Sequence, residues 1–370
     1  MKQCLFDPDN GSMSQNDDDD EYRCPPASSR LCRRAGGRME NCMNQEELRV
    51  HGEVRRRISR IGFGIAGFFA VTYAAQFAVL FFCSVFSLPV TESITGTWLL
   101  SMGTMYLFGF PAFLLIVTPL SGKRPFASER VRPVTFLVYF LISFAAVYIF
   151  NYFSSLLTAI TNAIFGTSSS STATDLIEKS PLILVVIFAV VIGPFVEEFM
   201  FRRVLIDRLL PFGEKFSILI SAVAFGLFHG NFVQFFYAAA LGSIFAYLYC
   251  KTGKLRYPYL LHMSINFCGS VIPLLLSRRL GLHDLPDLGV LTPEELAALA
   301  PRLFALILYF GTVFVLVLAG VLLFALRIRR IKFSAPMVEI PKEGRAKLLL
   351  SPGVLLAFLS FLGMFILSFF

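Results

Sequence analysis

The sequence has 370 residues, of which 56% are hydrophobic and only 16% are charged. A soluble domain usually carries about 25% charged residues, and here the apolar residues gather in long blocks, so we expect a polytopic membrane protein. Because the blocks are continuously apolar and do not alternate, they predict an all-α bundle of transmembrane helices and not a β-barrel. The net charge of +8 fits basic loops that set membrane orientation, and we expect no nucleic-acid partner.

Residues 1–50 are polar and irregular, and they include the run D-D-D-D-E. Such a composition predicts a disordered leader. Met43 opens M-N-Q-E-E-L-R-V shortly before the first apolar segment. Met43 is therefore an alternative start, in which case residues 1–42 are not translated.

Nine apolar segments follow in chain order. They lie at about 61–87, 96–119, 134–159, 181–204, 216–230, 232–250, 257–277, 303–326 and 348–370. Most exceed the ~20 residues that span a bilayer core. The fifth and sixth are short, and the ninth can either span or lie at the surface, so we expect eight or nine membrane helices. Segments four to seven, in 181–277, lie between N-terminal helices in 51–180 and C-terminal helices in 278–370.

The basic residues are more frequent in the even-numbered connections between these segments. R-R-R-I-S-R stands before the first segment, and R-I-R-R-I-K follows the eighth. Because cytoplasmic loops carry the excess of Lys and Arg, this pattern predicts a cytoplasmic N-terminus. We expect a multi-pass protein of a bacterial plasma membrane, in contact with the lipid bilayer.

Five ionisable residues at membrane depth lie in the fourth, fifth and seventh segments. They are Glu197, Glu198, Arg202, His229 and His262. Ionisable groups in a membrane are costly, and they usually face the interior of a helix bundle and pair there. We therefore expect the five to converge on one water-accessible cavity.

Helical spacing gives these residues different directions. Glu198 and Arg202 are i,i+4 and can pair on one face, whereas Glu197 points about 100° away. His262 and Asn266 are also i,i+4 on the seventh segment. The proline of Gly193-Pro194 removes a backbone hydrogen bond just before the acids, and we expect a kink there.

Water activation is the chemistry that fits these groups. A carboxylate in apolar surroundings is a better base near neutral pH, so Glu197 with a nearby histidine can activate water. The second histidine and the Asn266 amide can donate hydrogen bonds to an oxyanion on a carbonyl. These groups suffice for hydrolysis of a peptide bond without a covalent nucleophile.

Three motifs stand in order on separate segments: E-E-x-x-x-R from residue 197, F-x-x-x-H at 225–229 and H-x-x-x-N at 262–266. Over about residues 181–277, this pattern resembles the CPBP intramembrane proteases, also called the Abi or CAAX-protease family, which include the type II CAAX prenyl endopeptidases. The resemblance implies an endopeptidase whose substrate is a peptide or protein, either membrane-anchored or lipidated.

The resemblance also implies a role for each residue. Glu197 would be the general base and would share its water with His229. His262 and Asn266 would stabilise the oxyanion, and Glu198 with Arg202 would orient the site. Phe225 would pack against the site without reacting.

Alternatives stay open at this stage. Glu197, His229 and His262 could ligate zinc, although the chain has no H-E-x-x-H motif, and we expect the metal-free mechanism. A transporter or a non-proteolytic immunity or scaffold protein could carry similar intramembrane charges. A helix of the fifth segment starting near 216 would also place His229 deeper than Glu197. The two would meet only if that helix is tilted or shallow, or if the fourth segment reaches further than residue 204.

Overall fold

A computed structural model describes residues 39–125, 130–165, 172–282, 293–340, 348 and 350–367. These residues contain helices and no strands, which confirms the predicted all-α class. The chain divides into two compact units, Met1–Glu53 and Val54–Phe370. In the first unit, residues 39–53 are helical. This differs from the expected disorder over 1–50, whereas the rest of the predicted leader and the proposed start at Met43 are not tested by the described residues.

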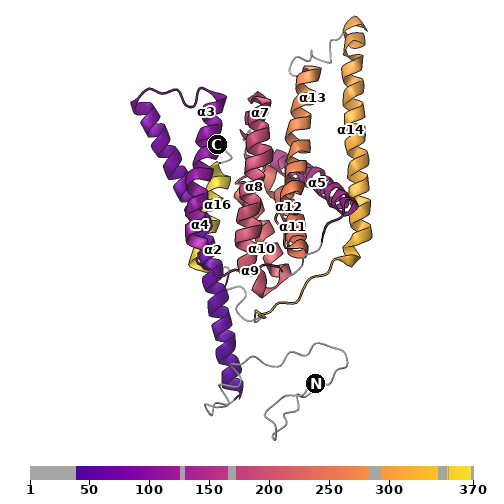
Figure 1. Ribbon diagram of the computed structural model, residues 1–370. Coiled ribbons are helices and arrows are strands. Elements are labelled where there is room, and N and C mark those ends of the chain that lie inside the picture. Colours follow the sequence, from indigo (N-terminus) through magenta and orange to yellow (C-terminus); the bar gives the residue numbers. More distant parts are fainter. Residues whose placement is uncertain are drawn as a thin grey trace. The chain divides into compact units, whose positions relative to one another are not determined.

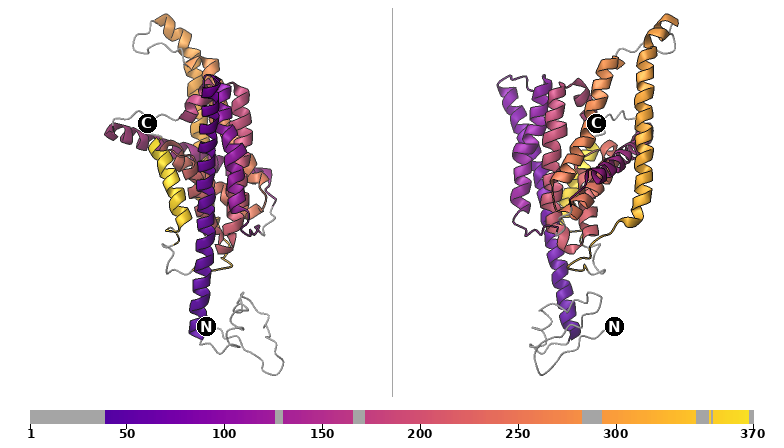
Figure 2. Two further views of the ribbon diagram at one scale, coloured as in Figure 1. Left: turned by 90° about the vertical axis from the view of Figure 1, so that its left-hand side faces the viewer. Right: turned by 45° about the vertical axis from the view of Figure 1, so that its right-hand side comes forward.

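Three long helical segments make up the N-terminal region of the second unit (Figure 1). The first is the part of α2 (Met39–Val85) that follows Glu53. The second combines α3 (Ile94–Trp98), η1 (Leu99–Gly103), η2 (Met105–Gly109) and α4 (Phe110–Val117). The third is α5 (Pro133–Phe165), which runs obliquely to its neighbours in every view and packs on α11 and α14 (Figures 1 and 2). A short helix, α6 (Thr172–Lys179), follows.

The region of segments four to seven begins with one continuous helical rod. Its parts are α7 (Leu182–Leu184), η3 (Val185–Ile192), α8 (Gly193–Glu198), η4 (Phe199–Ile206), α9 (Asp207–Leu209) and η5 (Leu210–Phe212). Wide π-helical turns lie on both sides of Gly193-Pro194. Such turns accommodate the hydrogen bond that the proline removes while the helix continues.

Helices α10 (Glu214–Phe228) and α11 (Phe232–Thr252) form a closely packed hairpin after the turn at Gly213. A Cβ atom at Gly226 would lie 2.8 Å from the Phe235 carbonyl oxygen, so only glycine allows this approach. A second continuous helical rod follows, made of α12 (Arg256–Asn266), η6 (Phe267–Val271) and α13 (Ile272–Leu280). Phe245 and Leu261 are fully buried where α11, α12, α5 and α14 meet.

The C-terminal region contains α14 (Pro293–Arg327), η8 (Ile328–Arg330) and α16 (Pro352–Leu367). In the described residues, seven helical segments are long and apolar enough to cross a membrane. The chain is thus a multi-pass membrane protein. The predicted fifth and ninth segments are α10 and α16, of 15 and 16 residues, and do not reach spanning length. The sixth does, because α11 has 21 residues.

Candidate active site

Glu197 and His229 lie at matching depths on two helices that run in opposite directions. The fourth segment does not end near residue 204 but continues to Phe212. Glu197 therefore lies about four turns before that end, and His229 lies about four turns beyond Glu214. A fourth segment that reaches beyond residue 204 was one of the conditions under which we expected Glu197 and His229 to meet.

Glu198 and Arg202 form a buried ion pair behind the site, as their spacing predicted. Arg202 Nη2 lies 3.1 Å from Glu198 Oε1, and Nε lies 3.0 Å from Oε2, with both side chains fully buried. Arg202 Nη1 also donates to Ser221 Oγ of α10 at 3.0 Å. The guanidinium lies over the Phe225 ring, 4.9 Å from its centroid. The buried charges are thus compensated, and the pair joins the fourth segment to α10.

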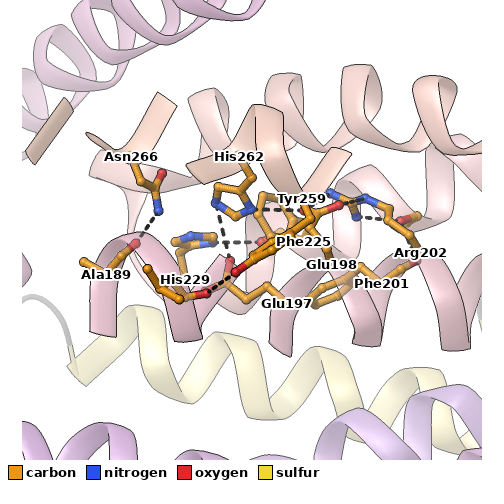
Figure 3. A network of polar contacts seen from close by, with 12 residues as sticks. Ala189, Glu197, Glu198, Phe201, Arg202, Phe225, His229, Tyr259, His262 and Asn266 are labelled. Carbon is orange, nitrogen blue, oxygen red and sulfur yellow. Dashed lines mark hydrogen bonds and ion pairs between the residues drawn. The ribbon is translucent and has the colours of Figure 1, made fainter. Parts of the chain in front are cut away.

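His262 lies between the two glutamates (Figure 3). Its Nδ1 is 3.1 Å from Glu198 Oε1, and its Nε2 is 3.8 Å from Glu197 Oε2. The Glu198 carboxylate is paired with Arg202 and accepts hydrogen bonds, so Nδ1 carries a hydrogen and Nε2 faces Glu197. The geometry thus places His262 beside Glu197, whereas the sequence motifs predicted only His229 as the histidine that acts with Glu197.

His229 caps the carboxyl end of α10 and faces the same space. Its Nδ1 donates to the Phe225 carbonyl oxygen at 2.9 Å, because a carbonyl can only accept. The Nε2 atom is then left for a further partner, and the Glu197 charge acts on this ring electrostatically. The Phe225 ring packs between the two imidazoles, with centroid distances of 5.1 Å to His229 and 5.8 Å to His262. The predicted packing role of Phe225 is confirmed.

Asn266 is fixed by the fourth segment. Its Nδ2 donates to the Ala189 carbonyl oxygen at 2.8 Å, one turn after His262 on the same rod (Figure 3). One amide hydrogen is therefore engaged in joining two helices, and the second remains for another acceptor. Such an interhelical bond is a structural role that membrane helices commonly give to Asn.

Exposure separates the six predicted residues into two groups. Glu198, Arg202 and His262 are buried. The Glu197 side chain is 19% exposed, and His229 and Asn266 are half-buried. Adjacent carboxylates in the chain thus have different environments, because the 100° step along a helix turns one inward and leaves the other accessible.

Tyr106 of η2 is a neighbour of this site that the sequence analysis missed. A Cβ atom at Gly193 would lie 3.0 Å from the Tyr106 hydroxyl and 3.8 Å from Glu197 Oε1. The phenol and the carboxylate therefore border the same small space beside Gly193. No sequence signal distinguishes Tyr106 from the other tyrosines of the apolar segments, because it stands in no recognisable motif.

The described residues include no group of three or more His, Cys, Asp or Glu side chains arranged to hold a metal ion. Glu197, His229 and His262 surround one space without forming such a ligand set. Glu197 Oε2 and His262 Nε2 lie 3.8 Å apart, and zinc ligation by these residues stays an alternative.

Comparisons with known proteins cover this part of the chain. Residues 179–268 match the family model described as Type II CAAX prenyl endopeptidase Rce1-like. A Bacillus subtilis protein named as a membrane peptidase, YdiL, is 33% identical over 96 residues, which cover 25% of this chain and 37% of that protein. The membrane-embedded CAAX protease MroQ of Staphylococcus aureus is 27% identical over 180 residues, which cover 44% of this chain and 69% of that protein. No solved structure matched the chain significantly.

The matched region contains all six residues of the candidate site, from Glu197 to Asn266, and every helix that carries them. Residues 179–268 thus carry the pattern of the Rce1-like type II CAAX prenyl endopeptidases, and the family resemblance predicted from the three motifs is confirmed.

Proposed function

We propose that the protein is an intramembrane endopeptidase in which Glu197 activates water for attack on a peptide bond. One observation carries the proposal. The half-buried Glu197 carboxylate lies 3.8 Å from His262 Nε2. The Nδ1 atom on the other side of the same ring contacts Glu198, which is ion-paired with Arg202. The same residues lie inside the segment that matches a protease family model.

The hydrogen-bonding pattern favours a water molecule at this place. Neutral His229 and His262 both carry hydrogen on Nδ1, because each Nδ1 faces an acceptor. Their Nε2 atoms and the Glu197 carboxylate are then three hydrogen-bond acceptors around one space. A water molecule can donate hydrogen bonds to two of them at a time. A distance of 3.8 Å is too long for a direct hydrogen bond.

The reaction would proceed by general acid–base catalysis. The water oxygen bonds to the peptide carbonyl carbon while one water proton moves to Glu197. The carbon–nitrogen bond then breaks as Glu197 returns the proton to the leaving nitrogen. The products are a carboxylic acid and an amine, which exchange a proton to give a carboxylate and an ammonium group.

Asn266 and His262 would stabilise the oxyanion that forms on the carbonyl. Asn266 retains one amide hydrogen after its bond to Ala189, and that hydrogen can be donated to the oxyanion. His262 can donate from Nε2 only in its protonated form, in which both ring nitrogens carry hydrogen. Glu198 and Arg202 would be positioning residues, because Glu198 contacts His262 and Arg202 holds Glu198.

The substrate would be a membrane-associated protein cut near its C-terminus or within a membrane segment. This class comes from the resemblance to CAAX proteases, and one matched relative is itself named as a membrane-embedded CAAX protease. The cut would occur on the cytoplasmic side if the basic connections orient the chain as predicted.

The test is turnover of a peptide panel by the purified full-length protein. The panel would contain C-terminal CAAX-type peptides with and without a prenyl group. Glu197→Ala is assayed beside the parent and beside Glu92→Ala, which removes an exposed glutamate between α2 and α3. We expect turnover by the parent and by Glu92→Ala, and its loss in Glu197→Ala.

A chelator arm addresses the zinc alternative. Turnover that persists with chelator supports the metal-free mechanism, whereas loss that zinc restores assigns Glu197, His229 and His262 to a metal. Equal turnover in Glu197→Ala and the parent removes the base from its role. An inactive parent across the panel favours the transporter, immunity or scaffold alternatives.

A further inference from the structure

A polar cavity lies at the amino end of α5, outside the candidate active site. It measures about 320 Å³ and is bordered by the segment before α5, the first two turns of α5, and the end of α11. Its polar lining residues are Arg130, Arg132, Thr135, Tyr139, Lys251 and Thr252. None of the six residues of the candidate active site contributes to it.

The charges that line this cavity are all positive. Lys251 donates to Glu214 Oε2 at 2.7 Å, so its charge is compensated. Arg130 and Arg132 are exposed, and neither has an ion pair within the part of the chain that the structure describes. None of the lining side chains that the structure describes is acidic. Among the described residues, the cavity therefore presents about two positive charges without an ion-pair partner.

The start of α5 adds further groups that favour an anion. Helix α5 has 33 residues and begins at Pro133, so its first amides carry the positive end of a helix dipole. Thr135 in that first turn is one of the lining residues, and its side chain carries a hydroxyl. Two guanidinium groups, a helix start and a hydroxyl together match a phosphate group.

The cavity has a fixed wall. The Tyr257 hydroxyl accepts from Val131 N at 3.3 Å and from Arg256 Nη2 at 3.0 Å. This contact ties the segment before α5 to the start of α12. Arg256 adds a further cation at the same end of the helices, although it does not line the cavity.

An apolar groove of about 540 Å³ follows on the adjacent face of α5. Phe136, Leu137 and Phe140 of α5 line it, together with Leu260 and Phe267 of the α12 rod. These positions on the rod point away from the side that carries the buried His262. The groove is therefore separate from the candidate active site and opens where the helices face lipid.

We propose that these two features together bind one anionic phospholipid, with its phosphate in the cavity beside Arg130 and Arg132 and one acyl chain in the groove beside Phe136 and Phe140. A free phosphate would use the cavity alone. The lipid uses both faces of α5, and juxtamembrane Arg and Lys attract anionic headgroups. The inference does not rest on the proposed protease activity.

The test measures lipid binding to the purified full-length protein in a neutral detergent. Dioleoyl-phosphatidylglycerol is titrated against dioleoyl-phosphatidylcholine, which has the same chains and no net charge. Two further arms use inorganic phosphate and dihexanoyl-phosphatidylglycerol, which has the headgroup on short chains. Binding is read by native mass spectrometry and by the shift in the thermal unfolding midpoint.

The double variant Arg130→Gln/Arg132→Gln is compared with Arg55→Gln/Arg56→Gln, which removes two exposed arginines from α2. We expect the phosphatidylglycerol Kd to rise about tenfold or more in the first variant, since each juxtamembrane cation contributes about fivefold. We expect it to change less than about twofold in the second. If the first variant unfolds without lipid, the single variant Arg132→Gln replaces it.

Three results would overturn the proposal. Equal affinity for phosphatidylglycerol and phosphatidylcholine would remove the headgroup from the site. Equal loss in both arginine variants would leave only a general charge effect. Inorganic phosphate or the short-chain lipid binding as tightly as the long-chain lipid would show that the groove holds no acyl chain.

Discussion

Glu197 and Glu198 are neighbours in the chain, yet they lie in two different regions of the site. Glu198 is fully buried and is held by Arg202 and His262. Glu197 is 19% exposed, and its Oε2 lies 3.8 Å from His262 Nε2. One region is closed and ion-paired, and the other is accessible.

The difference shows how a membrane helix can carry both a structural and a reactive acid. A buried charge must be paired because its desolvation is costly, so Glu198 is committed to Arg202. A base must keep a free lone pair and contact water, and the more exposed Glu197 suits that role in the proposed mechanism. We therefore expect the buried region to determine stability and the accessible region to determine turnover.

The largest effect is expected from breaking the buried pair. Arg202→Met leaves the Glu198 carboxylate buried without its partner, and we expect a loss of about 3–5 kcal/mol in unfolding free energy. The double variant Glu198→Gln/Arg202→Met should recover part of that loss. Denaturant titration in detergent measures both.

Arg203→Met is the matched control for that experiment. Arg203 pairs with Asp207 at 2.8 Å with the same i,i+4 spacing on the same rod, but its side chain is 25% exposed. We expect a loss of about 1 kcal/mol or less. Similar losses in Arg202→Met and Arg203→Met would contradict the assignment of the buried region to stability.

A second prediction concerns the accessible region. His229→Gln removes the Nε2 acceptor beside Glu197, and we expect kcat to fall about 100-fold or more with little change in KM. The unfolding midpoint should stay near that of the parent. The control is Gln234→Ala, a half-buried polar residue of α11. A raised KM with unchanged kcat would instead assign His229 to substrate binding.

A third prediction concerns Ser221, which accepts a hydrogen bond from Arg202 of the buried pair. Ser221→Ala removes the acceptor of Arg202 Nη1, and we expect a loss of about 1–2 kcal/mol in unfolding free energy. Ser217→Ala one turn earlier removes only a hydroxyl that donates to the Gly213 carbonyl oxygen, so its loss should be smaller. Equal losses would show that Ser221 does not support the ion pair.

The smallest effect concerns pH and a group outside the spanning segments. Burial opposes ionisation of Glu214, but hydrogen bonds from Lys251 and Ser334 outweigh it and hold the pKa of Glu214 below its ordinary value of 4.5. A lowered pKa contributes stability above the ordinary value, and this is lost as pH falls through the folded-state pKa. Below about pH 4.5, the unfolding midpoint should therefore fall more steeply in the parent than in Glu214→Gln. Parallel curves would contradict this linkage.

The sequence predicted the helical class, the converging residues and the pairing of Glu198 with Arg202. Those predictions succeed because residue type and helical period determine which side chains share a face. The ends of the fourth segment were harder to predict, because Phe199–Phe212 mixes apolar and charged residues whose burial depends on α10. The contact of His262 with both glutamates was also missed, because the rotation of one helix against another is set by packing rather than by spacing. Tyr106 was missed because it stands in no recognisable motif.

The central claim is that two adjacent carboxylates have different duties, and a pair of isosteric variants tests it most directly. Glu197→Gln and Glu198→Gln are assayed for turnover of one cleaved peptide and for the unfolding midpoint. We expect Glu197→Gln to lose about 100-fold or more in kcat with its midpoint unchanged, and Glu198→Gln to show the larger fall in midpoint. Full turnover by Glu197→Gln, or a fall in its midpoint as large as that of Glu198→Gln, would contradict the account.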